Sequence, residues 1–238
     1  MNTQKTIKNT CWKRIRFHEI SSTNDYAKSR RGEGKNLVIT AERQTGGRGT
    51  KGRSFSSQEG GVYLSALTFY QDFPAQRAFE IMAGAAVAVC RTLRFYGLSP
   101  MIKWANDIYV QDKKICGILI ENVFSGNNVA SSVVGIGLNV YNELPSELDF
   151  IATTVQKELG RALNVEEITA RLICELEKGA SMDEYRAFLG YLGREVVLIL
   201  SDERVPATLL LVDDAGALHA LVNGEEKIFH AAEVSIKI

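Results

Sequence analysis

A basic, glycine-rich stretch between two apolar runs constrains the fold of this chain more than any other feature. It reads QTGGRGTKGR over residues 44–53, and it separates apolar runs at 37–39 and 62–67. The flanking runs predict strands, so the chain is expected to form strand, long loop and strand. Glycines let a backbone approach phosphate oxygens, and the loop's cations could bind them. Taken alone, however, the composition fits a flexible surface loop better, and neither a Walker A nor a G-x-G-x-x-G pattern is present.

Helix and strand signals alternate along most of the remaining chain. A Ser-Ser-Thr-Asn cap precedes a short helix at 25–30, and Pro74 opens a helix that ends at Tyr96. Strands are expected at 108–110, 115–123 and 131–140, and capped helices at 165–178 and 182–192. The expected fold class is α+β, a mixed β-sheet with flanking helices.

The pattern changes after Gly193 to short β runs separated by turn residues. These runs cover 195–200, 207–212, 217–222 and 227–229. They predict a small β-barrel. The predicted domains are therefore residues 1–193 and residues 194–238.

Length and hydropathy limit the class of protein. The 238 residues are 45% hydrophobic, enough for one large or two modest domains with a real core. The longest nearly unbroken apolar stretch, 81–90, is about half of the roughly 20 residues that a membrane helix needs. The first eleven residues are polar and lysine-bearing, so no secretory signal is expected and a cytoplasmic location is predicted.

The formal net charge of zero hides two oppositely charged halves. Residues 1–142 hold 19 Lys or Arg against 10 Asp or Glu, whereas residues 143–238 hold 9 against 18. A basic half is compatible with nucleic acid, with an anionic small molecule such as a nucleotide, or with a solvated face. The charge alone does not decide among the three.

Cysteine and histidine patterns exclude two classes of site. The four cysteines at 11, 90, 116 and 174 form no C-x-x-C pair and lie at no zinc-ligand spacing from a histidine. The three histidines are widely separated, and no G-x-S-x-G elbow accompanies them. A structural zinc and a hydrolase triad are therefore not expected.

Three further segments concentrate polar residues or glycines beside predicted strands. They read KWAND at 103–107, KICGILIE at 114–121 and GIGLN at 135–139. Each has an ordinary structural explanation: a turn, a solvated lysine at a strand end, and glycines that ease packing. Each also has a functional one: a polar cluster, a fixed cation for a carboxylate, and close approach to a ligand.

Taken in this order, with Ser22-Thr23-Asn24 ahead of them, the segments resemble the biotin protein ligases (biotin–acetyl-CoA-carboxylase ligases). That family's pattern has a G-R-G-x-x-G-R loop, a K-W-x-N-D segment and a K-x-x-G-I-L-x-E strand. The resemblance covers nearly the whole chain. It also implies that the C-terminal β region is a Src-homology-3-like barrel.

The resemblance implies an activity. Biotin would be activated with ATP and Mg²⁺ to biotinyl-5′-AMP and then passed to a lysine of a biotin carboxyl carrier protein domain. The biotin carboxylate attacks the α-phosphate, so catalysis consists of positioning and charge stabilisation and requires no protein nucleophile.

Individual residues take roles by their match to the family pattern. Arg48 would neutralise the carboxylate and phosphate charges, Lys114 would hold the biotin carboxyl oxygen, and Asp107 would support Mg²⁺ or deprotonate the acceptor lysine. The implied biotin-binding residues are Ser22, Thr23, Asn24, Gln44, Arg48, Gly49, Thr50 and Lys114. The implied ATP or adenylate residues are Arg48, Lys51, Arg53, Lys103, Asn106 and Asn139. Mg²⁺ is expected to bind through the phosphates rather than through dedicated protein ligands.

Three positions depart from the family pattern. Thr50 stands where a second loop arginine is usual, Phe55 where tryptophan is usual, and Ala105 where proline is common. Thr50 removes one cation, so the adenylate is expected to be held less tightly, with Lys51 and Arg53 in partial compensation. Phe55 preserves an aromatic surface.

Other functions remain open at this stage. One is a lipoate or octanoate ligase, which is related in fold; another is a non-catalytic biotin or nucleotide sensor, which the missing loop arginine invites. A DNA-binding role is not expected, because about 15 residues before the first core element are too few for a winged helix. A homodimer formed through sheet edges is left open, as is the identity of the carrier protein.

Overall fold

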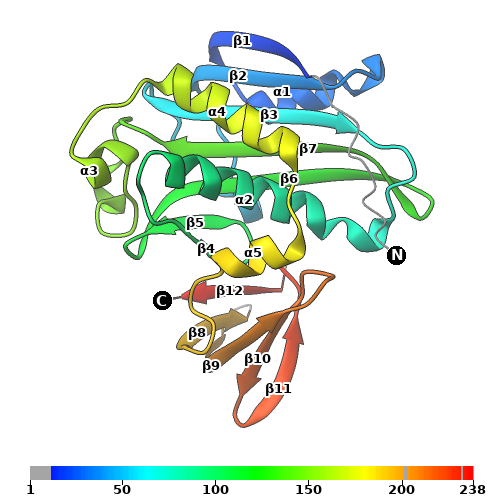
Figure 1. The fold of residues 1–238 in the computed structure, drawn as a ribbon, viewed down its shortest axis with the longest axis vertical. Coiled ribbons are helices and arrows are strands. Elements are labelled where there is room, and N and C mark those ends of the chain that lie inside the picture. Colours follow the sequence, from blue (N-terminus) through cyan, green and yellow to red (C-terminus); the bar gives the residue numbers. More distant parts are fainter. Residues whose placement is uncertain (1–11, 201–202, 232, 238) are drawn as a thin grey trace.

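The computed structural model describes residues 12–200, 203–231 and 233–237, and two sheets organise them (Figure 1). The larger sheet has the strand order β1-β2-β3-β7-β6-β5-β4. Its strands are β1 (Lys13–Ile20), β2 (Leu37–Gln44), β3 (Gly61–Phe69), β4 (Met101–Lys103), β5 (Asp107–Val110), β6 (Lys113–Ser125) and β7 (Asn128–Asn139). β1 and β2 run parallel and the other neighbours run antiparallel. The expected mixed sheet is confirmed.

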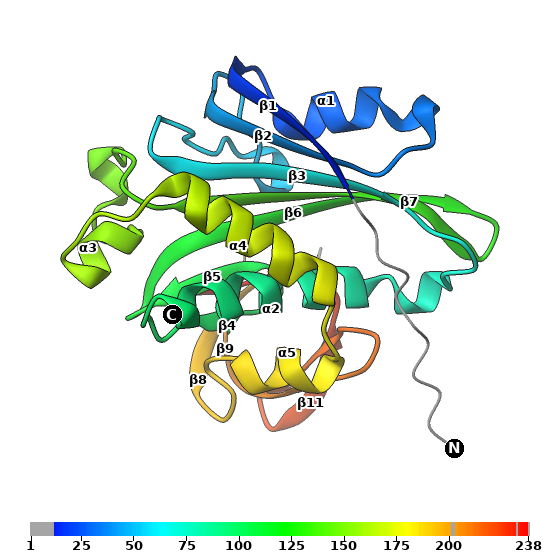
Figure 2. The same cartoon turned by 45° about the horizontal axis from the view of Figure 1, so that its top comes forward.

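Helices cover both faces of this sheet. They are α1 (Thr23–Ser29), α2 (Phe79–Phe95), α3 (Val155–Leu159), α4 (Val165–Lys178) and α5 (Met182–Phe188). α2 and α4 lie over one face and α1 over the other (Figures 1 and 2). Strand alternation explains the division: Val38 joins the core beneath α2, whereas Leu37 and Ile39 pack with Ala27 of α1.

Side-chain caps set the helix starts that the sequence predicts. Ser22 Oγ accepts the Asp25 N–H at 3.2 Å at the start of α1, and Ser181 and Glu184 form a capping box on α5. The expected helix at 182–192 ends earlier, at Phe188. The chain turns extended at Leu189, and the Gly190 N–H then donates to the carbonyl of Ile102 at 2.9 Å.

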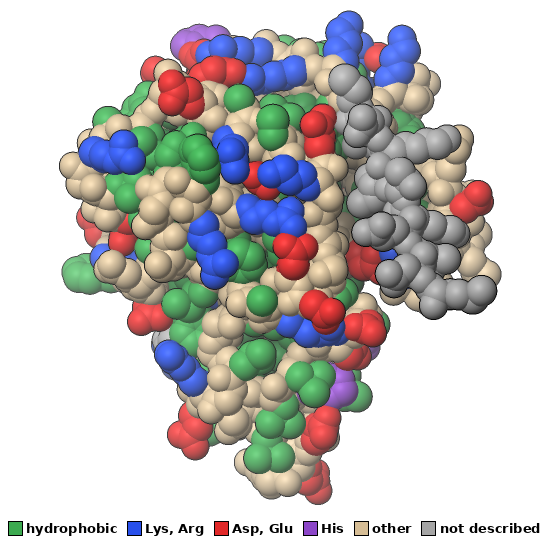
Figure 3. Space-filling view, in the orientation of Figure 1, with side chains coloured by type: hydrophobic (Ala, Val, Ile, Leu, Met, Phe, Trp, Pro, Cys, Tyr) green, Lys and Arg blue, Asp and Glu red, His purple; other side chains and the backbone are tan. Residues whose placement is uncertain are grey.

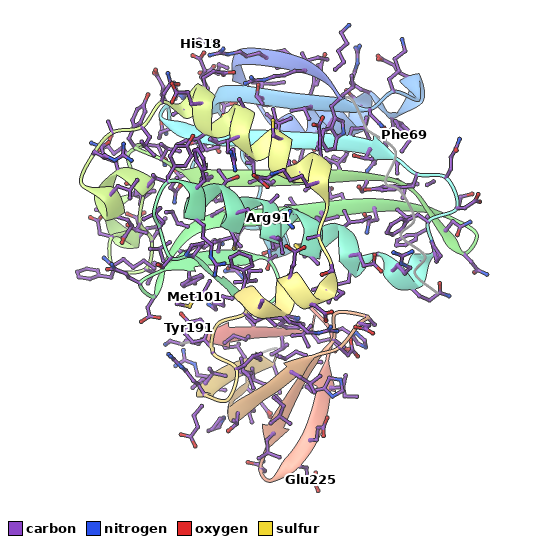
Figure 4. The ribbon with its side chains drawn as sticks, in the orientation of Figure 1. His18, Phe69, Arg91, Met101, Tyr191 and Glu225 are labelled. Carbon is purple, nitrogen blue, oxygen red and sulfur yellow. The ribbon has the colours of Figure 1, made fainter. Side chains whose placement is uncertain are left out.

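A group of basic side chains lies on the outer surface of α2 and α4 (Figure 3). Arg91 lies where α2, α4 and α5 meet (Figure 4), donates to the carbonyl of Gly179 at 2.9 Å and pairs with Glu184. Arg171 pairs with the buried Glu175 at 2.9 Å. Arg91, one of the cations of the first 142 residues, therefore connects the helices of this layer.

The smaller sheet follows Gly193. Its strands are β8 (Glu195–Leu200), β9 (Glu203–Val212), β10 (Leu218–Val222), β11 (Glu225–Phe229) and β12 (Val234–Lys237), in the antiparallel order β11-β10-β9-β8-β12. Asn223 and Gly224, both at positive φ, make the β10–β11 turn. The expected all-β region after Gly193 is confirmed.

The two sheets meet through one turn of the smaller one. Trp104 Nε1 donates to the carbonyl of Gly216 at 3.0 Å, and the Gly216 backbone lies so close to Phe79 that a Cβ there would meet the ring at 2.0 Å. Residues of both sheets also share one hydrophobic cluster. The division into domains at residues 1–193 and 194–238 stays a prediction. No helix in the described part of the chain is both long and apolar enough to cross a bilayer.

Candidate active site

Small residues hollow the face of the large sheet that is turned toward α1. Ser65 of β3 pairs with Gly135 of β7, and Gly117 of β6 pairs with Gly137 of β7. A Cβ at Gly135 would lie 2.2 Å from Asn24 Oδ1 and one at Gly137 would lie 2.6 Å from the Phe55 ring, so a side chain has no room at either position. These glycines form the floor of a pocket.

Residues from all the sequence segments line this pocket. Ten of those named from the sequence are among the lining residues: Ser22, Thr23, Asn24, Gln44, Arg48, Gly49, Thr50, Asn106, Asp107 and Lys114. They come from the start of α1, the end of β2, the glycine-rich loop and the two ends of the β5–β6 hairpin. The lining also includes Gly135, Ile136 and Gly137, so residues up to 115 positions apart in the sequence, from Ser22 to Gly137, meet at one place.

A hydrogen-bond network fixes the amide side chains at one end of the pocket. Gln44 Oε1 accepts the backbone N–H of Thr23 at 2.8 Å and its hydroxyl at 2.9 Å, while Gln44 Nε2 donates to Ser57 Oγ at 2.9 Å. The Ser65 hydroxyl donates to Asn24 Oδ1 at 2.5 Å. Both amides are thereby held in one orientation, and the pocket end offers donors and acceptors at fixed places.

The glycine-rich loop folds back on itself rather than hanging free. The Phe55 N–H donates to the carbonyl of Gly47 at 2.9 Å, and the Gly49 N–H donates to that of Arg53 at 2.7 Å. A Cβ at Gly47 would lie 2.4 Å from the Phe55 carbonyl oxygen, so glycine is required there. This hairpin holds Arg48 at the pocket rim, where 58% of its side chain is exposed.

Two cations at the pocket are each paired with a carboxylate. Arg48 Nη2 lies 3.0 Å from Asp25 Oδ2, and Lys114 Nζ lies 2.6 Å from Asp107 Oδ1. Gly117 makes room for the lysine, because a Cβ there would meet Lys114 Nζ at 3.2 Å. Both cations are therefore placed before any substrate arrives.

Lys103 lies near the Asp107–Lys114 ion pair. Its Nζ donates to the Tyr109 hydroxyl at 3.1 Å, and burial lowers the pKa of Lys103, which Asp107 partly offsets and Lys114 and Arg53 reinforce. Burial also raises the pKa of Tyr109 to about 12, so the phenol stays protonated as a hydrogen-bond acceptor. Lys103 is thus close enough to interact electrostatically with Asp107, Lys114 and Arg53.

Some residues named from the sequence lie outside the pocket lining. Of those in the described part of the chain, these are Arg53, Lys103 and Asn139. Asn139 is buried and its side chain is engaged elsewhere, because Nδ2 donates to the carbonyl of Thr153 and Oδ1 accepts from Asn142, both at 3.2 Å. The Lys51 side chain is outside the described residues. The roles assigned to these four residues stay predictions, as do the roles assigned to the ten residues that line the pocket.

Sequence reasoning missed Asp25 and Ser65, which complete the site. Ser65 is a buried polar residue in an apolar strand, and its hydroxyl donates to Asn24, which lines the pocket. Asp25 was assigned only to the first turn of a helix, where acidic residues are common. Among the described residues, no cluster of three or more His, Cys, Asp or Glu is placed to hold a metal ion.

Comparison with known proteins assigns the chain to a family. Residues 17–139, from β1 to the end of β7, match the biotin/lipoate A/B protein ligase family. The matched segment contains every residue that lines the pocket. The chain belongs to this family, within which its relatives are biotin protein ligases.

Three relatives define that likeness. The bifunctional ligase/repressor BirA of Bacillus subtilis is 34% identical over 172 residues, which cover 68% of this chain and 52% of BirA. The biotin–[acetyl-CoA-carboxylase] ligase of Mycobacterium tuberculosis is 29% identical, with 91% and 86% covered. The structure of the Aquifex aeolicus biotin protein ligase in complex with biotin and ATP superposes with a TM-score of 0.78 at 28% identity, with 94% and 98% covered. The match thus spans about half the length of the B. subtilis relative.

Proposed function

We propose that this protein is a biotin–[acetyl-CoA-carboxylase] ligase. It activates biotin with ATP to biotinyl-5′-AMP and transfers biotin to a lysine of a carboxylase carrier domain. The observation that carries the proposal is that one pocket joins an oriented set of amide and hydroxyl groups to two fixed cations, Arg48 and Lys114. The likeness to the M. tuberculosis ligase and to the A. aeolicus complex supports the same activity.

The two ends of the pocket suit the two ends of biotin. The ureido ring has both N–H donors and a carbonyl acceptor, which the Thr23, Asn24 and Gln44 end can match. The valerate carboxylate is an anion, and Lys114 and Arg48 are the cations that line the pocket. Biotin would therefore lie along the glycine floor, with its carboxylate between the two cations.

The chemistry then requires little beyond placement. A carboxylate oxygen of biotin attacks the α-phosphorus of ATP, the α–β bridging bond breaks, and pyrophosphate leaves. Arg48 and Lys114 reduce the repulsion between the two anions as they approach. In the second step the acceptor lysine amine attacks the acyl carbon and AMP leaves. Asp107, at the pocket, either takes the amine proton or supports the metal.

Mg²⁺ would be held mainly by the ATP phosphates. The protein donor set fits this arrangement, because the Asp107 carboxylate that lines the pocket is already paired with Lys114 at 2.6 Å. When bound, the ion would neutralise phosphate charge during the displacement.

Pyrophosphate exchange into ATP tests the proposed activity. Exchange that depends on biotin supports the ligase, whereas exchange that depends on lipoate instead supports the related ligase. Biotin binding without any exchange indicates a sensor. Transfer of labelled biotin to a purified carrier domain then tests the second step.

Three further expectations belong to the proposal. One is a cytoplasmic location. The protein partner is a biotin carboxyl carrier domain, and DNA is not an expected ligand. Dimerisation stays open.

A further inference from the structure

A line of charged and polar side chains links the glycine-rich loop, through α1 and β6, to Asn24 in the pocket lining. Arg48 Nη2 lies 3.0 Å from Asp25 Oδ2, and the other oxygen, Oδ1, lies 2.8 Å from Lys28 Nζ. Lys28 Nζ also lies 2.9 Å from Glu121 Oε1, and Glu121 Oε2 accepts from Asn24 Nδ2 at 3.2 Å. Five side chains from the loop, α1 and β6 are thus joined in one line.

The Asp25 carboxylate is held by more contacts than an acidic residue in the first turn of a helix usually makes. Its two oxygens bind two different cations, and its side chain is only 34% exposed. Lys28, at 23% exposure, is fixed from both sides by Asp25 and Glu121. The hydrogen bond to Asp25 is the main cause that raises the pKa of Lys28, so this lysine stays charged. The carboxylate is therefore fixed in place, and Arg48 is the partner that is free to move.

The Nη2 group of Arg48 that binds Asp25 is not free to bind a second anion at the same time. In the structure the anion at Nη2 is Asp25, whereas the proposed reaction needs this cation for the biotin carboxylate and the α-phosphate. The loop backbone is independently fixed by the Gly49–Arg53 and Gly47–Phe55 hydrogen bonds. Loss of Asp25 would therefore leave the loop backbone in place, while the guanidinium would have no anion of the protein that competes with the substrate for it.

We propose that Asp25 is a positioning residue that serves as the resting counter-ion of Arg48 and is displaced by the substrate's anionic group. The inference rests on the proposed function. Asp25 keeps the guanidinium at the rim while the pocket is empty, and it lowers the affinity for biotin and biotinyl-adenylate by competing for the same cation.

Substitution of the charge alone tests this competition. Asp25→Asn keeps the size of the side chain, and we expect biotin to bind about threefold more tightly, which is the ratio for a partly exposed ion pair. KM for biotin should fall by a similar factor while kcat changes less than twofold. Asp25→Glu keeps the charge and should stay close to the unmodified protein. Biotin affinity is measured by equilibrium dialysis, and KM by pyrophosphate exchange.

Two comparisons separate competition from a general structural effect. In an Arg48→Ala background, Asp25→Asn should no longer change biotin affinity, because the shared cation is gone. Raising the salt concentration should shrink the gain, since the competing interactions are electrostatic. Glu33→Gln is the matched control: it removes one negative charge near α1 from a residue that pairs with Arg30 at 2.6 Å, and it should leave biotin affinity unchanged.

The outcomes distinguish this inference from the proposed function. If the unmodified protein exchanges pyrophosphate with biotin but Asp25→Asn binds biotin equally or more weakly, the inference alone is overturned. The same holds if the gain persists without Arg48. If the unmodified protein shows no biotin-dependent exchange, the proposed function fails and the inference falls with it. Asp25→Ser, a second neutral replacement suited to a helix first turn, must behave like Asp25→Asn; a weaker affinity in both overturns the inference.

Discussion

The two faces of the seven-stranded sheet are built from the same strands, but one face packs in the core and the other carries the pocket. On the face toward α2 and α4, β7 places Ile136 and β6 places Ile118 in the core, each only 2% exposed. On the other face, the neighbouring positions are Gly135, Gly137 and Gly117, which leave a pocket. Because side chains alternate along a strand, the isoleucines of a segment pack in the core on one face, while its glycines leave space for the pocket on the other. Substitutions one residue apart should therefore have unlike consequences.

The largest expected effect lies on the pocket face, at Arg48. Arg48→Ala should lower biotin-dependent pyrophosphate exchange by about 10³-fold, since it removes a cation aimed at the charge that develops in the reaction. Its unfolding free energy should change by less than about 0.5 kcal/mol because the side chain is mostly exposed. Exchange assays and urea denaturation measure the two quantities. Activity near the level of the unmodified protein would show that Arg48 is not the catalytic cation.

The next effect lies on the core face. Ile136→Ala should lower the unfolding free energy by about 3 kcal/mol, through lost burial and the cavity left behind. The activity per folded molecule should stay within a few-fold, although Ile136 also contributes to the pocket lining between two glycines of the floor, because the residue packs in the core cluster of the opposite face. Urea denaturation followed by tryptophan fluorescence gives the stability, and exchange assays below the transition give the activity. A large loss of activity in the folded variant would break the division between the faces.

A methyl group on the pocket floor should have an intermediate effect. Gly137→Ala places a Cβ 2.6 Å from the Phe55 ring, so the ring must move into space that the substrate needs. We expect biotin affinity to fall about tenfold, within the roughly 1–3 kcal/mol typical of overpacking. Phe55→Leu in the same chain should restore part of it. Gly32→Ala, where no atom lies within 4 Å of an added Cβ, is the control and should bind biotin normally.

The smallest effect is expected at the rim of the pocket, at Thr50. Thr50 lines the pocket beside Arg48 and lacks the charge that the family pattern has there. Thr50→Arg should slow the release of biotinyl-adenylate about fivefold, the scale of one added partly exposed ion pair. Single-turnover trapping of free adenylate measures this rate. Equal release rates in the two proteins would contradict the view that Thr50 loosens the hold on the intermediate.

Local signals in the sequence were sufficient for much of the fold. The caps at Asn164 and Ser181 predicted the starts of α4 and α5, since a cap is decided by residues within one turn, whereas α1 begins at Thr23, two residues before the expected start. β1 was missed because it is an edge strand whose charged residues hide its alternation; only Ile15 and Phe17 pack against the core. β12 was missed because four residues carry too short a pattern.

The candidate site was predictable as a set of residues and not as a set of contacts. Motifs placed ten residues that the fold brings into one pocket. The partner of Arg48 was not predictable, because Asp25 meets it only through the packing of α1 against β2 and β3. Asn139 shows the converse: it belongs to a motif, yet its amide is bound to Thr153. Long-range pairing of this kind is decided by tertiary packing, which spacing along the chain does not encode.

The contact between Trp104 and Gly216 connects the C-terminal sheet to the pocket. Trp104 lies two residues before Asn106 and three before Asp107, so the turn around Gly216 supports the segment that carries these two pocket residues. The backbone passes from one sheet to the other near Gly193, but the hydrophobic core continues across this boundary. Removal of the residues after Gly193 would therefore expose Phe79 and Trp104. It would also weaken the placement of the nearby Asp107 carboxylate, which pairs with Lys114.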